Sequence, residues 1–167
     1  NSDNNLVLDV INCTFADNTL SYNRGSTISV SYNSQVNLYN TILYGNDGYS
    51  ITLFENVLVN INNSLIEGSN NNVHYYYPLS IVNWEDGNLQ GDTNPLFDST
   101  NEQYPYSLSA NSPCIDGGTL NLPEGIELPE YDLAGNPRVV GNSIDMGAYE
   151  YQGTAAQEEF NIQNSTF

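Results

Sequence analysis

The residues of this chain best suited to ligand chemistry are four aromatic side chains close together in sequence: Tyr75, Tyr76, Tyr77 and Trp84. Flat aromatic rings can stack on the faces of sugar rings, while their polar tips form hydrogen bonds with sugar hydroxyls. The cluster therefore suggests a carbohydrate-binding surface. The alternative is a structural role, in which the rings cover the end of a hydrophobic core or its last repeat.

Catalytic groups are harder to assemble from this sequence. A glycoside hydrolase needs two carboxylates that face each other across the substrate. Glu85, Asp86 and Asp92 are the nearest candidates, but adjacent residues on a strand point to opposite faces. A lyase acting on uronic acids needs a metal or a basic side chain, and the chain has no Lys and a single His. We therefore expect no catalytic residue here. The alternative is a polysaccharide lyase or hydrolase whose groove lies partly in preceding sequence.

Metal and cofactor signals are weak. His74 has no companion His or Cys at a ligand spacing, and no glycine-rich calcium repeat is present. We expect no cofactor and no metal site. Scattered Asp and Asn loops leave weak Ca²⁺ binding open.

The charge of the chain excludes some partners. Twenty acidic residues against two basic ones give a net charge of −18. Such a chain repels nucleic acid and anionic membrane surfaces, and no apolar run approaches the length of a membrane span. We expect no nucleic-acid partner and no membrane insertion. Glycans and protein partners remain, although the acids alone could serve to keep an extracellular surface soluble.

Three segments near the start repeat one pattern at spacings of 28 and 23 residues. They are Val10–Phe15, Leu38–Leu43 and Ile61–Ile66. Aligned, they give an apolar column, an asparagine column, a β-prone column and a closing apolar column. The intervening positions are smaller or more polar, as expected of strands with one inner and one outer face. Repeats of this length are typical of a solenoid, and the pattern predicts a parallel β-helix.

The asparagine column, Asn12, Asn40 and Asn63, supports this prediction. Stacked amides can bond to one another as a ladder, because each carries donors and an acceptor. Asn also tolerates the left-handed backbone of a sharp corner. Asn88 follows 25 residues after Asn63 and suggests a fourth, atypical coil. The alternative is a chance alignment, since Asn is abundant throughout the chain.

The sequence divides into three parts. Residues 1–93 are expected to form about three to four coils. Residues 94–151 contain six prolines, which interrupt long strands, and are expected to form an irregular cap over the open end of the solenoid. Residues 152–167 form an acidic and polar tail that is either a linker or an assembly strand.

Four residues are assigned structural roles in this cap. Arg138 is one of two cations, with Arg24, and is expected to pair with a carboxylate, Asp145 first and Asp116 second. Asp132 opens a Gly-Asn turn and is expected to bind backbone amides. The two cysteines, Cys13 and Cys114, are expected to be free thiols.

Five short motifs then occur in order: NPLF, YSL, SPCIDGG, DLAGNPR and IDMGAYEY, between Asn94 and Tyr151. This run resembles the C-terminal part of secreted bacterial right-handed parallel β-helix proteins, including choice-of-anchor Q domain proteins of the pectate-lyase-like superfamily. The resemblance implies a right-handed solenoid and an exported or cell-surface location. It also implies no catalytic residues, because the motifs belong to the cap. We therefore expect a non-catalytic exported or cell-surface module with a structural, assembly or adhesive role. In that family a sorting domain often follows, whereas residues 152–167 of this sequence are short, acidic and polar, which leaves the mode of anchoring open.

The two ends of the chain complete the expectations. The first β segment begins by Leu6, so the first coil would expose apolar side chains and unpaired backbone groups. We expect this edge to be covered, by preceding coils or, less favoured, by a neighbouring subunit in an end-to-end assembly. Phe160–Phe167 is a candidate strand in which Phe160, Ile162 and Asn164 alternate onto one face.

Overall fold

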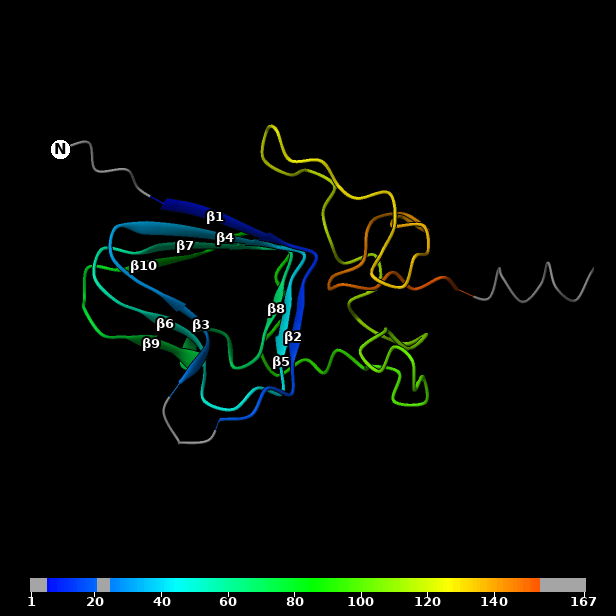
Figure 1. Ribbon diagram of the computed structural model, residues 1–167, viewed down its shortest axis with the longest axis horizontal. Helices are drawn as coiled ribbons and strands as arrows, with labels where there is room; N and C mark the ends of the chain where they lie inside the picture. Colours follow the sequence, from blue (N-terminus) through cyan, green and yellow to red (C-terminus); the bar gives the residue numbers. More distant parts are fainter. Residues whose placement is uncertain (1–5, 21–24, 154–167) are drawn as a thin grey trace, which may run out of the picture.

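The computed structural model describes residues 6–20 and 25–153 of the chain, and within them the fold is all-β (Figure 1). It contains ten strands and a single 3₁₀ turn, η1 (Ser69–Asn72). The strands are β1 (Leu6–Ile11), β2 (Thr14–Ala16), β3 (Ser26–Val30), β4 (Ser34–Tyr39), β5 (Ile42–Tyr44), β6 (Tyr49–Leu53), β7 (Leu58–Asn62), β8 (Leu65–Ile66), β9 (Val73–Tyr75) and β10 (Ile81–Trp84). No helix among these residues is long and apolar enough to cross a membrane.

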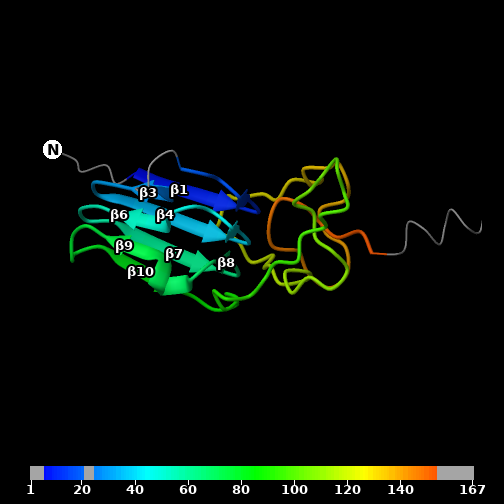
Figure 2. The ribbon, with the colours of Figure 1, turned by 90° about the horizontal axis from the view of Figure 1, so that it is seen from below.

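The strands form three parallel sheets, ordered β1-β4-β7-β10, β2-β5-β8 and β3-β6-β9. The chain visits the three sheets in the same order in each turn, so β1–β3, β4–β6 and β7–β9 make coils 1, 2 and 3. Figure 1 looks along the stack, with the three sheets around a common interior, and Figure 2 shows the coils side-on. The predicted all-β, solenoid-like architecture is therefore confirmed.

The predicted repeat register is confirmed as well. Val10 pairs with Leu38, which pairs with Ile61, and Phe15 pairs with Leu43, which pairs with Ile66. In coils 2 and 3 these side chains are fully buried in one core cluster. The periodicity of apolar residues thus identified the inward-facing positions.

A fourth coil begins with β10, which pairs in parallel with β7. The register places Gly87 rather than Asn88 opposite Asn63, because the Asn63 N–H bonds to the carbonyl of the preceding Asp86, just as the Asn40 N–H bonds to the Asn62 carbonyl before Asn63. Asn88 instead lies beside Ser64 and accepts its N–H at 2.9 Å. One extra residue before the bridge between Leu65 and Leu89 accounts for the shift.

The cap does not lie over the open end of the solenoid, where the sequence had placed it. It packs sideways against the outer face of sheet β2-β5-β8, as both ribbon views show (Figures 1 and 2). Ile42 and Leu65 point outward from that sheet and are fully buried against the cap. Their cap partners are Leu108, Cys114 and Met146. The third repeat column is apolar because it forms a second buried interface, between the outer face of this sheet and the cap. Its apolar side chains are therefore removed from water by the cap and not by the interior of the solenoid.

The asparagine column forms the corners between the first two sheets. Asn12, Asn40 and Asn63 have φ of 50°, 50° and 44°, which confirms the predicted left-handed backbone. Their amides bond mainly to the cap rather than to one another. Nδ2 donates to the carbonyls of Asp145, Thr119 and Gly117 respectively, and only one longer contact of 3.4 Å joins Asn40 to Asn12.

The amide ladder lies in another column, which the sequence interpretation missed. Asn83 donates to Asn60, Asn60 to Asn37, and Asn37 to Asp9, at 2.8, 2.7 and 2.7 Å. These residues occupy one register position on the four strands of sheet β1-β4-β7-β10. Every amide therefore donates toward the coil that precedes it.

Candidate functional site

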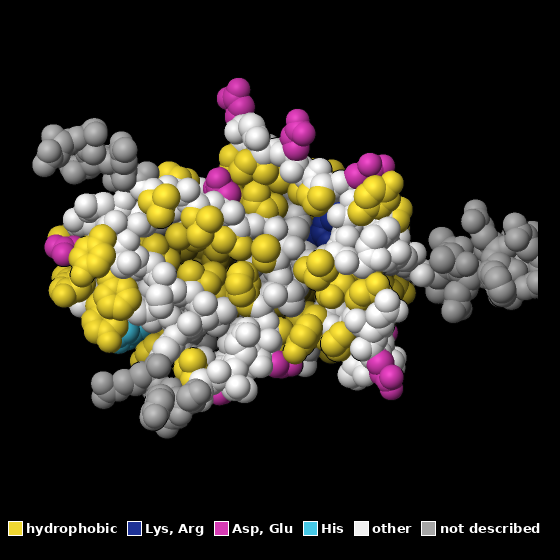
Figure 3. Space-filling model, in the orientation of Figure 1, with side chains coloured by type: hydrophobic (Ala, Val, Ile, Leu, Met, Phe, Trp, Pro, Cys, Tyr) yellow, Lys and Arg dark blue, Asp and Glu magenta, His cyan; other side chains and the backbone are white. Residues whose placement is uncertain are grey.

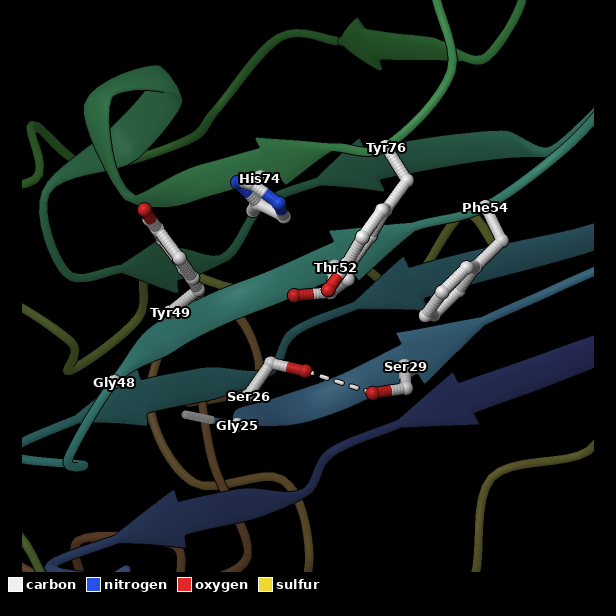
Figure 4. A pocket seen from close by; sticks show the side chains of 9 residues that line it. All are labelled: Gly25, Ser26, Ser29, Gly48, Tyr49, Thr52, Phe54, His74 and Tyr76. Atoms are coloured by element: carbon white, nitrogen blue, oxygen red, sulfur yellow. Dashed lines mark hydrogen bonds between the residues drawn. The ribbon is translucent and has the colours of Figure 1, made fainter. Parts of the chain in front are cut away.

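A groove on the outer face of sheet β3-β6-β9 is the candidate functional site (Figure 4). Its volume is about 520 Å³. We call it the aromatic groove, and define it by the residues that line it: Gly25, Ser26, Ser29, Gly48, Tyr49, Thr52, Phe54, His74 and Tyr76.

The polar side chains of the groove are aligned by the parallel pairing of strands β3, β6 and β9. Ser29 pairs with Thr52, and Thr52 pairs with His74, so these side chains form one row across the three coils. Ser26 lies beside this row and its hydroxyl is 2.8 Å from that of Ser29. Figure 4 shows the hydroxyls between the aromatic rings. The row offers neutral hydrogen-bonding groups from successive coils.

Aromatic rings form the walls. Tyr49 stacks on His74 with centroids 4.7 Å apart, and Phe54 stacks on Tyr76 at 4.6 Å with only 10° between the planes. These separations match the spacing of neighbouring strands, because the partners come from coils 2 and 3. Tyr49 and Tyr76 are 42% and 59% exposed, so the rings are accessible to a ligand rather than part of the core.

The groove is hollow because the first coil contributes no ring to it. That coil supplies Gly25, Ser26 and Ser29 to the lining, and the small Ser26 stands opposite Tyr49 of the next coil. At one end Gly48 has φ of 80°, and a Cβ there would approach the Gly25 carbonyl oxygen to 2.5 Å. Both the left-handed backbone and this close approach require glycine.

The structure separates the four aromatic residues predicted to bind glycans. Tyr76 lines the groove, whereas Tyr75 and Tyr77 are exposed outside its lining and the Tyr75 hydroxyl bonds to Asn70. Trp84 is half-buried against the core, with its indole N–H buried and without a partner. Its position agrees with the structural alternative for this residue.

Sequence reasoning missed Tyr49, Phe54 and His74 as groove residues. A signal was present, since alignment of residues 51–53 with residues 73–75 places Phe54 beside Tyr76. The three aligned segments of the sequence cover only strands of the first two sheets. The third sheet therefore remained unassigned.

Within the part of the chain that the structure describes, the lining of the groove contains no carboxylate, lysine or arginine. Among residues 6–20 and 25–153, no three His, Cys, Asp or Glu side chains are grouped so as to hold a metal. Glu85, Asp86 and Asp92 lie outside the groove as well. Its lining therefore supports stacking and neutral hydrogen bonding, not the paired-carboxylate chemistry of glycoside hydrolysis.

Arg138 is buried in the cap, at 2% exposure, but its contacts differ from the predicted ion pair. Its Nη2 donates to the main-chain carbonyls of Gly147 at 2.7 Å and Asp145 at 3.4 Å. Burial lowers the pKa of the guanidinium, while the carboxylates of Glu150, Asp132 and Asp145 act in the opposite direction. The Arg138 side chain therefore holds the backbone of the cap in place through these carbonyls. It lies near several carboxylates but does not pair with one of them.

The cap carboxylates in turn bind backbone amides. Asp116 accepts from Asn142 and Ser143, and Asp145 accepts from Asp116 and Tyr151. Asp132 accepts from Ala134, Asn136 and Glu150, as its turn sequence predicted. These bonds give the four predicted cap residues structural positions.

Both cysteines are free, as expected. Burial raises the pKa of the Cys114 thiol to about 11 and also raises the pKa of Cys13. The thiolate is the reactive form, so both side chains are poor nucleophiles near neutral pH.

Comparison with protein-family models, with curated proteins and with solved structures found no match for this chain.

Proposed function

We propose that this chain is part of a right-handed parallel β-helix that binds an uncharged glycan in the aromatic groove without cleaving it. The helical assignment is supported by the fixed order of the three sheets and by the left-handed asparagine corners. An exported or cell-surface location, in a bacterium, follows from the resemblance of the cap motifs and belongs to the same proposal.

The observation that carries the binding proposal is the arrangement of rings around hydroxyls. Tyr49 and Phe54 stand on either side of Thr52, and each is extended by a stacked ring from the next coil. Sugars present apolar faces and hydroxyls together, which such a site complements.

Charge decides between neutral and acidic glycans. The chain carries a net charge of −18, and the lining residues of the groove that the structure describes include no Lys or Arg. A polyuronate would be repelled at long range and would find neither of these side chains among the described lining residues. A neutral polysaccharide avoids both penalties.

Calorimetric titration tests this proposal. Neutral oligosaccharides from glucans, xylans and galactans are compared with oligogalacturonate. We expect a neutral oligosaccharide to bind with about micromolar to millimolar affinity, and Phe54→Ala or Tyr76→Ala to weaken it by roughly tenfold or more. Tyr77→Ala is the matched control, since it removes an exposed tyrosine outside the groove.

Three results would reject the proposal. The first is equal loss of affinity in the Tyr77 and Tyr76 variants. The second is that no neutral oligosaccharide binds at all. The third is release of reducing ends or unsaturated products from a bound glycan, which would show an enzyme.

A further inference from the structure

The first-coil end of the solenoid is an open, apolar surface in the described structure. Strands β1, β2 and β3 each lie at the edge of their sheet. Leu6 is 69% exposed, and Val10 and Phe15 are only partly buried, although their counterparts in coil 2 are fully buried. Figure 3 looks onto this end and shows hydrophobic side chains gathered over the interior. Unpaired strand edges of this kind are templates for another strand.

A cavity beside this end continues the contact between solenoid and cap. It has a volume of about 580 Å³ and lies between Ile11–Phe15 of the first corner and residues 126–133 of the cap, with mostly apolar side chains around it. Asn63, Asn40 and Asn12 each reach one cap carbonyl in turn. The corner of a further coil, stacked on Asn12, would enter this cavity.

The amide ladder specifies what such a coil must carry. Each asparagine donates to the preceding coil, and the series ends at Asp9, which accepts from Asn37. An ionised carboxylate can only accept, so the next side chain in the column must donate. At the coil-4 edge of a second copy, by contrast, Asn83 already uses one of its two amide N–H groups to bond to Asn60.

Residues 161–167, NIQNSTF, repeat the coil pattern position by position. Asn161 corresponds to Asp9, Asn37 and Asn60 of the ladder. Ile162, Asn164 and Phe167 correspond to Val10, Asn12 and Phe15, and Ser165 matches the small residue after each corner. Their structure lies outside the described residues, but their sequence satisfies the apolar, corner and ladder requirements together.

We propose that residues 161–167 of one copy dock as an added coil segment on the first-coil end of a neighbouring copy. Asn161 donates to Asp9, Ile162 and Phe167 cover Val10 and Phe15, and Asn164 enters the cavity above Asn12. A neighbour is favoured over the same copy because the described chain ends at Gly153, on the side of the cap away from the solenoid (Figures 1 and 2). The intervening residues 154–160 span at most about 25 Å.

Sedimentation velocity of the full chain over a wide range of concentrations tests this docking. We expect concentration-dependent association, abolished by Ile162→Asp. Asn161→Asp opposes two carboxylates and should weaken association roughly tenfold or more. The double variant Asp9→Asn/Asn161→Asp exchanges donor and acceptor and should restore it. Gln157→Glu, which adds the same charge to the tail outside the repeat, is the control.

Three outcomes would overturn the proposal. The first is the mass of a single chain at every concentration. If the backbone amides of Leu6–Ile11 were protected from hydrogen exchange in that single chain, the segment would dock within one copy, which also overturns the proposal. Another is association that Ile162→Asp leaves unchanged. The third is an equal effect of Gln157→Glu and Asn161→Asp.

Discussion

Asn40 is the side chain that most directly joins the solenoid to the cap, and replacing it tests how much this junction stabilises the fold. It is fully buried, donates to the Thr119 carbonyl at 2.9 Å and accepts the Thr119 N–H at 2.7 Å. Two such bonds contribute about 0.5–1.5 kcal/mol each. Alanine at φ of 50° adds about 1 kcal/mol of backbone strain. Asn40→Ala should therefore lower the free energy of unfolding by about 2–4 kcal/mol.

Two variants separate the lost bonds from the backbone strain. Asn40→Gly removes the amide but adopts the left-handed backbone freely, so it should lower stability by about 1–3 kcal/mol. Asn56→Ala is the matched control, because Asn56 has φ of 54° but is exposed and bonds only to Asn33. It should cost about 1 kcal/mol.

Urea unfolding followed by circular dichroism measures all three variants, with the free energy obtained by linear extrapolation. Fluorescence of Trp84, which packs against the core, provides a second probe of the same transition. Equal losses for Asn40→Ala and Asn56→Ala would refute the reasoning, since they would leave only backbone strain. Wild-type stability of Asn40→Gly would refute it as well.

The remaining predictions concern the ladder and the cap. Asn60→Ala removes a donor and an acceptor from the middle of the ladder and should lower the urea midpoint, with a loss of about 1–2 kcal/mol; Asn83→Ala, at its end, should cost less. Arg138→Ala removes a buried charged donor from two carbonyls and should cost about 3 kcal/mol, and an unchanged melting temperature would show that these bonds contribute nothing. Burial raises the pKa of Glu150 to about 7, so the folded state keeps a proton that the unfolded state loses near 4.5. The contribution of Glu150 to stability should therefore be greatest below that pH and fall by up to about 3 kcal/mol as the pH rises to 7, and a pH series of melting curves should become flatter in Glu150→Gln.

The repeat pattern predicted the solenoid part because each coil buries the same columns. Val10, Leu38 and Ile61 share one inward position, and a side-chain period of two fixes which neighbours point outward. The corner backbone followed from residue type, since Asn tolerates positive φ better than most residues. These are local properties, which a sequence carries directly.

The positions of the cap and of the groove depend on distant contacts, and here sequence reasoning was incomplete. Nothing local in Ile42 or Leu65 distinguishes an outward apolar side chain under a cap from an inward one. The groove depends on a third sheet whose strands lack an asparagine marker, so the pairing of Thr52 with His74 was not identified. Arg138 was expected to find a carboxylate, yet those carboxylates are occupied by backbone amides.

The lateral cap also sets a rule for how this chain can vary in length through evolution. Asp145, Thr119 and Gly117 offer one carbonyl to each successive corner, so the cap matches the solenoid coil by coil. A duplication that inserted a coil between β3 and β4 would move Asn12 by about one strand spacing, roughly 4.8 Å, and break its bond to the cap. Coils added at the outer ends would leave all three bonds in place. Relatives of this chain should therefore differ in coil number at their ends and keep the middle constant, unless the cap has changed as well.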